Sequence, residues 1–144
     1  MNFLRPEIIN EIAQELDSGF LAYIHKTTGE RIFVPDRDEY SEIEFEAWNE
    51  EFELLESNFS DYYEIEKWSS HEAYEIMLHF AEQLSQNRTL QNNLLDALNK
   101  RKPFSAFKFV IDNSGEFREI WFDFKNKKLY EYVEEQLNRL KEID

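Results

Sequence analysis

The stretch from Leu94 to Phe124 constrains the fold of this chain more than any other part of it. It holds the densest run of aromatic residues and the only sustained basic cluster of an acidic protein. Its apolar residues recur at intervals of three and four positions, which places them on one face of a helix. They form two groups, Phe104, Phe107 and Ile111, and then Phe117, Ile120, Trp121 and Phe124. The spacing predicts two helices, the first of which begins at Pro103, with a turn between them at 113–115.

The rest of the chain shows helical spacing in some segments and β-rich runs in others. A capping-box pattern at 69–72 precedes the clearest amphipathic stripe. Gly29 lies between two β-rich runs, where it can supply the positive φ that a hairpin loop needs. The predicted helices lie at about 6–17, 40–59, 73–84, 90–98 and 126–141, and the predicted strands at about 20–25, 31–35 and 62–68.

These elements predict the α+β class. A β-hairpin and a third strand form a small antiparallel sheet, helices pack on one side of it, and the C-terminal half is helical. The length of 144 residues is typical of one domain, and three glycines and three prolines leave little material for a flexible linker. We therefore expect residues 1–144 to form a single domain.

Composition also limits the location and the chemistry. No apolar run approaches the roughly 20 residues that span a bilayer, and Glu7 and Glu11 interrupt what would be the apolar part of a signal peptide. We therefore expect a cytoplasmic protein with no membrane partner. The absence of cysteine excludes disulfides, a thiolate nucleophile and a cysteine-ligated zinc site.

The net charge of −15 is concentrated in the first two-thirds of the chain. Residues 1–96 carry 22 acidic and 6 basic residues, whereas residues 97–144 carry 9 acidic and 10 basic ones. The segment 36–66, which we call the acidic segment, holds 13 acidic residues and one basic residue. Such a field repels free nucleic acid and anionic membranes. It either keeps the protein soluble or attracts a basic partner.

The leading hypothesis is a non-enzymatic interaction module that presents the acidic segment to a basic protein surface. A sharper version is nucleic-acid mimicry, in which carboxylates take the places of phosphates on a nucleic-acid-binding protein. The residues expected to contact such a partner are Glu42, Glu46, Glu50 and Glu53. The sequence does not predict the oligomeric state.

A metal-dependent hydrolase is one alternative. Glu72, Glu75 and His79, with Glu82 beyond them, fall on the polar face of a predicted helix and could converge on a divalent cation. A solvated helix face explains the same pattern and is favoured, because Glu and His are ordinary on exposed surfaces. Glycine-rich phosphate loops and nucleophile motifs are absent, so neither catalysis nor a cofactor is expected.

Single-stranded nucleic acid binding is the other alternative. The basic residues Lys100, Arg101, Lys102 and Lys108 accompany Phe104, Phe107 and Trp121, and cations interleaved with rings are typical of such sites. The helical spacing of the rings favours burial instead. Nucleic acid is therefore not the expected partner.

The same stretch carries a family resemblance in two groups of residues: Ala97, Leu98, Arg101, Phe104, Phe107 and Lys108, and then Trp121, Phe122 and Phe124. In these residues the chain resembles the bacterial Uncharacterised Protein Family 0158 (UPF0158). Members of that family read Ala-Leu-x-Gly-Arg-Gly-Ala-Phe-Arg-Arg-Phe-Lys, then a Trp-aromatic-x-Phe element and a C-terminal helix. The early hairpin is similar to the family's first part more weakly. The chain departs at Lys100 and Lys102, where the family has glycines, and at Pro103, where it has alanine. The resemblance supports the predicted topology and implies no known activity.

Overall fold

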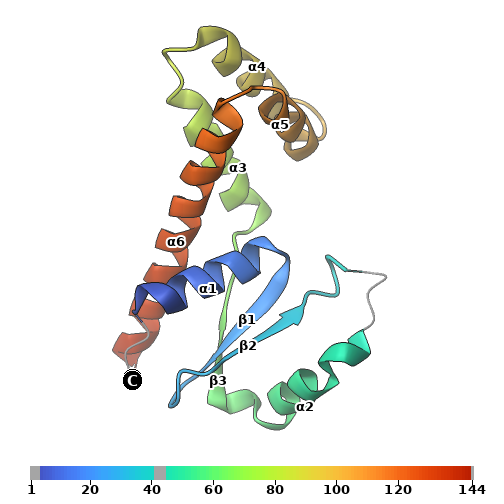
Figure 1. Cartoon of the computed structure of the whole chain (residues 1–144), viewed down its shortest axis with the longest axis vertical. Coiled ribbons are helices and arrows are strands. Elements are labelled where there is room, and N and C mark those ends of the chain that lie inside the picture. The colour runs from blue at the N-terminus through green and yellow to red at the C-terminus, as the bar shows by residue number, and fades with distance from the viewer. Residues whose placement is uncertain (1–3, 41–44, 144) are drawn as a thin grey trace. The chain divides into compact units, whose positions relative to one another are not determined.

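The computed structural model in Figure 1 describes residues 4–40 and 45–143, and it divides the chain into two compact units. The sheet unit comprises Met1–Lys67 and Leu129–Asp144, and the helical unit comprises Trp68–Lys128. Helix α6 (Phe117–Ile143) contributes its first part to the helical unit and the remainder to the sheet unit. The α+β class and the helical C-terminal half are confirmed. That residues 1–144 form a single domain stays a prediction.

The sheet is antiparallel, with strand order β2-β1-β3. Its strands are β1 (Phe20–His25), β2 (Arg31–Pro35) and β3 (Tyr62–Ile65), so both the hairpin and the third strand are confirmed. The hairpin turn has Gly29 at a φ of 76°, and the His25 Nδ1 atom accepts hydrogen bonds from the backbone N–H groups of Thr27 and Thr28, each at 3.1 Å. This histidine therefore shapes a turn.

Helix α1 (Pro6–Asp17) covers one face of the sheet. Its buried stripe consists of Ile8, Ile9, Ile12, Ala13 and Leu16. Ala22 and Ile24 of β1 and Ile65 of β3 are fully buried on the same face of the strands, and the Arg31 guanidinium next to them binds Glu11 of α1 at 2.7 Å. Successive residues of a strand point to opposite faces, so Leu21 and Tyr23 lie on the other side.

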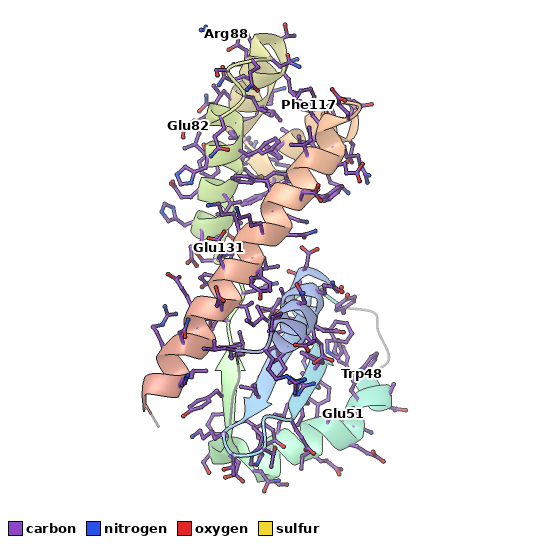
Figure 2. All side chains as sticks on the ribbon, turned by 60° about the vertical axis from the view of Figure 1, so that its left-hand side comes forward. Trp48, Glu51, Glu82, Arg88, Phe117 and Glu131 are labelled. Atoms are coloured by element: carbon purple, nitrogen blue, oxygen red, sulfur yellow. The ribbon has the colours of Figure 1, made fainter. Side chains whose placement is uncertain are left out.

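The second face is covered by the acidic segment. A 3-10 turn η1 (Phe45–Trp48) leads into α2 (Asn49–Ser57), and a second turn η2 (Phe59–Asp61) leads into β3. Figure 2 labels Trp48 and Glu51 at the start of this run. The predicted helix at 40–59 is thus shorter, and its residues 41–44 lie outside the described part of the chain. The sheet carries α1 on one face and α2 on the other, whereas the sequence predicted helices on one side.

The helical unit packs α3 (Ser70–Glu82), α4 (Arg88–Leu98), α5 (Pro103–Asp112) and the first part of α6 around aromatic rings. In Figure 2, Glu82 marks the end of α3 and Arg88 the start of α4. The predicted capping box is present at the start of α3. In the core, the Trp121 ring centroid lies 4.9 Å from that of Phe107 and 5.2 Å from that of Phe80. Edge-on contacts of this kind fill a core with large apolar area.

Helix α6 is one continuous helix, although the sequence predicted two, at 117–124 and 126–141. Lys125 alone lies between the two predicted helices, and neither it nor the first residues of the second predicted helix, Asn126, Lys127 and Lys128, are glycine or proline. The two groups of apolar residues that were assigned to separate helices belong to one helix, and they are buried in different units. Within residues 4–40 and 45–143, no helix is long and apolar enough to cross a membrane.

Candidate functional site

A groove of about 420 Å³ lies between the sheet and α2 in the sheet unit. Paired residues on antiparallel strands share a face, so all three strands contribute side chains to its floor. The floor is formed by Leu21, Tyr23, Val34, Tyr62 and Glu64. The wall is formed by Phe52, Leu55 and Glu56 of α2 and by Phe59. A concave, mostly apolar site with a few polar groups is the usual form of a binding pocket.

The polar part of the floor is the pair formed by Tyr23 and Glu64. These residues face each other across β1 and β3, and the Tyr23 hydroxyl donates a long hydrogen bond of 3.5 Å to Glu64 Oε1. Burial, followed by the Glu64 carboxylate, raises the pKa of Tyr23 above its ordinary value of 10.0. Tyr23 is therefore a neutral donor at physiological pH, and Glu64 is an acceptor.

Of the residues that the structure describes, Arg37 is the one cation that lines the groove, and aromatic rings contact its guanidinium. Its guanidinium carbon lies 4.5 Å from the ring centroid of Phe45 and 5.2 Å from that of Phe52. Contacts of this type stabilise a cation on the face of a ring. Among the described residues, no ion pair engages the carboxylates of Glu56 or Glu64. The groove thus offers apolar surface next to two uncompensated negative charges.

Comparison with known proteins places the whole chain in one family. The model of the uncharacterised protein family UPF0158 matches residues 2–143, which include every residue of the groove. The chain belongs to UPF0158. The resemblance in the basic-aromatic stretch is thereby confirmed and extended over nearly the full length of the sequence. No curated protein and no solved structure matches the chain.

Three of the four predicted partner-binding glutamates of this UPF0158 protein lie in the described part of the chain, and none of the three lines the groove. Glu42 lies outside the described residues, and Glu46, Glu50 and Glu53 are exposed away from the groove lining. The acidic residues that do line the groove are Glu56 and Glu64, which the sequence analysis did not single out. The spacing of Tyr62 and Glu64, two positions apart in β3, was visible in the sequence and places them on one face of the sheet. The sequence did not show which side of α2 faces the groove.

The predicted metal ligands of α3 have other local roles. The Glu72 carboxylate accepts a hydrogen bond from the Ser69 N–H at 3.0 Å in the capping box. Glu75 Oε1 lies 3.9 Å from Nε2 of His71, which is one helical turn earlier in α3. His79 is exposed. The described part of this UPF0158 chain holds no group of three His, Asp or Glu side chains that could bind a metal ion. No observation favours the hydrolase alternative.

The residues of the basic-aromatic motif separate into a buried and an exposed set. Phe107 and Trp121 are buried in the helical unit, as their spacing predicted, whereas Phe104 is 43% exposed. Arg101 and Lys108 are exposed. The sequence analysis also missed Phe109, which is 71% exposed. Its position, out of phase with Phe107 and Ile111, was the feature that could have identified it.

Proposed function

We propose that this protein is a non-enzymatic interaction module of the bacterial cytoplasm. In this proposal, the groove of the sheet unit binds a segment of a partner protein that combines apolar side chains with Lys or Arg. The observation that carries the proposal is the groove itself, in which apolar walls lie beside Glu56 and Glu64. A basic-apolar segment matches both features.

Apolar contact would supply most of the affinity. Phe59 at the groove is 79% exposed, so a large apolar side chain remains uncovered at the site. Exposed apolar surface around a concave site is typical of binding surfaces. A partner side chain that enters the groove would remove this surface from water.

Charge would supply orientation and association rate. The acidic segment carries 13 acidic residues against Arg37 alone, and the rings of Phe45 and Phe52 hold that arginine. Negative potential of this kind steers a basic segment toward the site and repels acidic ones. A partner Lys or Arg near Glu64 would form a charge-assisted hydrogen bond in a partly apolar setting.

The test uses two short fluorescent peptides that share the same leucines. One peptide carries lysines between the leucines and the other carries glutamates. We expect only the lysine peptide to bind the full chain in fluorescence anisotropy, more tightly at about 50 mM than at about 200 mM salt. In NMR titrations of the labelled protein, the perturbed amides should include Leu21, Tyr23 and Leu55.

Two double variants with the same change of charge separate groove contact from long-range attraction. Glu56→Gln with Glu64→Gln should weaken peptide binding by about tenfold, which corresponds to about 1.4 kcal/mol. Glu46→Gln with Glu50→Gln alters exposed carboxylates outside the groove and should weaken it by less than threefold. If the two double variants lost the same amount of peptide affinity, the peptide would be attracted by the acidic surface as a whole and not by contacts in the groove. Failure of the lysine peptide to bind at low salt would overturn the proposal.

A further inference from the structure

Helix α5 exposes two phenylalanine rings in the helical unit. Phe109 is 71% exposed and Phe104 is 43% exposed, whereas Phe107 and Ile111 of the same helix are buried. At 100° per residue, Phe109 projects from the side opposite the two buried residues, and Phe104 lies at the edge of the buried face. The core of the helical unit therefore does not use the Phe109 ring.

Four basic residues lie close to these rings in the sequence. Lys100, Arg101 and Lys102 directly precede α5, and Lys108 lies one turn after Phe104 and next to Phe109. In the part of the chain that the structure describes, their charged groups form no ion pair, hydrogen bond or ring contact. No acidic residue occurs between Asp96 and Asp112. The segment thus carries four positive charges that nothing nearby in the sequence offsets.

Three other cations of the helical unit are engaged by neighbouring side chains. Arg118 binds Asp112 at 3.1 Å, and Lys125 and Lys128 lie over the rings of Phe122 and Phe124, at 5.0 and 5.6 Å. The contrast sets apart one surface, which we call the α5 patch: Lys100, Arg101, Lys102, Phe104, Lys108 and Phe109. It combines free cations with free rings.

We infer that the α5 patch binds single-stranded nucleic acid. Cations that follow the phosphates and rings on which bases stack are the two elements of such sites. Burial of the aromatic rings was the reason not to expect nucleic acid as a partner, and the structure leaves two rings exposed. The negative charge of the molecule is also unevenly distributed: the helical unit carries 8 acidic and 9 basic residues, so the excess of acids belongs to the sheet unit.

An acidic peptide is the main competing occupant, and the rings argue against it. Carboxylates would pair with the lysines but would leave Phe104 and Phe109 in contact with water. Unpaired bases cover apolar rings and place phosphates within reach of the cations at the same time. Stacking therefore gives a criterion that separates the two ligands.

The test compares three polyanions on the full-length protein: a labelled oligothymidylate, an abasic oligonucleotide of equal length, and polyglutamate. We expect the oligothymidylate to bind at least tenfold more tightly than the other two in fluorescence anisotropy. The logarithm of its binding constant should fall with the logarithm of salt with a slope of about −3, because each of four neutralised phosphates contributes about −0.7. Equal binding of the three polyanions would overturn the inference, as would absence of binding at low salt.

Phe109→Ala should weaken oligothymidylate binding by about tenfold and leave the salt slope unchanged, since it removes a stacking surface and no charge. Lys102→Glu with Lys108→Glu should weaken binding and reduce the slope. Ile120→Ala, the control, removes an exposed apolar side chain of α6 that belongs neither to the α5 patch nor to the groove, and it should not change the affinity. An unchanged affinity of the Phe109 variant, with the fold intact by circular dichroism, would overturn the stacking role.

The groove and the α5 patch are separable by the same variants. Phe109→Ala should bind the lysine peptide as the parent does, so failure at one site leaves the other site testable. The α5 patch could instead dock on the acidic segment of a second copy of the chain. Sedimentation velocity decides this alternative: if Lys102→Glu with Lys108→Glu changes the oligomeric state while the parent binds no oligonucleotide, the inference is wrong.

Discussion

The side-chain amide of Gln136 makes the two hydrogen bonds with Glu66 that a neighbouring strand would make. The Glu66 N–H donates to Gln136 Oε1 at 2.9 Å, and Gln136 Nε2 donates to the Glu66 carbonyl at 2.7 Å. Glu66 directly follows β3, an edge strand, and Gln136 is the buried polar residue of α6 at 8% exposure. The helix therefore satisfies backbone groups that would otherwise end the sheet unpaired.

Gln136→Ala should lower the free energy of unfolding by about 1–3 kcal/mol, because it leaves two partly buried backbone groups without partners. Urea denaturation followed by circular dichroism measures the change. Asn138→Ala, at an exposed position two residues later on α6, is the control and should stay within about 0.5 kcal/mol. Similar values for the two variants would contradict the role assigned to Gln136.

Phe107 and Phe109 make a matched pair in the helical unit, since they are the same residue type two positions apart. Phe107→Ala should cost about 3–5 kcal/mol, because it opens a cavity beside Trp121. Phe109→Ala should change stability by less than about 0.5 kcal/mol, because the ring is exposed. Thermal denaturation of both variants would show the difference, and a large loss for Phe109→Ala would place that ring in the core.

Ser69 begins α3 through the reciprocal hydrogen bonds of the capping box. Its Oγ accepts from the Glu72 N–H at 3.1 Å, and the Glu72 carboxylate accepts from the Ser69 N–H at 3.0 Å. Ser69→Ala should therefore cost about 1 kcal/mol. Ser70→Ala next to it makes no capping bond and serves as the control. Chemical denaturation of the two variants at neutral pH should separate them.

Tyr23 should make the stability of the protein fall in alkali. Its pKa is raised above 10.0 in the folded chain by burial and by Glu64, and it is ordinary in the unfolded chain. Between the two values the folded state keeps a proton that the unfolded state has lost, so the free energy of unfolding decreases as pH rises. The contribution is complete below about pH 10 and is lost as pH passes through the folded pKa.

Tyr23→Phe has no hydroxyl to ionise, so its stability should fall less steeply above about pH 10 than that of the parent. Urea denaturation at a series of pH values measures the slope of the free energy of unfolding against pH for both proteins. The other titrating groups contribute equally to both slopes, so the difference between the slopes reports Tyr23. Glu64→Gln should lower the pKa of Tyr23 toward its ordinary value, which the ultraviolet absorbance of tyrosinate would report. Parallel pH profiles for Tyr23→Phe and the parent would contradict the prediction.

Local patterns in the sequence were enough to locate most elements of this fold. The predicted bounds of α1, β1 and β2 agree with the structure, because Pro6, Gly19 and Gly29 mark their ends chemically. The break predicted inside α6 was wrong for a physical reason. Its apolar face changes along its length because Trp121 and Val133 are buried in different units, and no local residue encodes that change.

The candidate site could be predicted from the sequence less well than the fold. The acidic segment is a distinctive region of the sequence, but the groove depends on which residues of α2 turn toward β1 and β3. Glu56 faces the groove and Glu53 does not, although both are glutamates of one short helix. The distinction arises from the orientation of α2, which turns Phe52 and Leu55 toward the groove and is a tertiary feature that composition and spacing do not specify.

The shared use of α6 has a consequence for the order in which this protein is made. The strands of the sheet unit belong to the first 67 residues, yet Val133, Gln136 and Leu137, which complete that unit, lie near the end of the chain. A ribosome synthesises the whole helical unit before it adds them, and a domain folds as a unit when its residues have emerged. The three strands are therefore translated before the helical unit, yet the unit to which they belong is finished after it, and until then the nascent chain exposes an edge strand whose partner has not yet been synthesised.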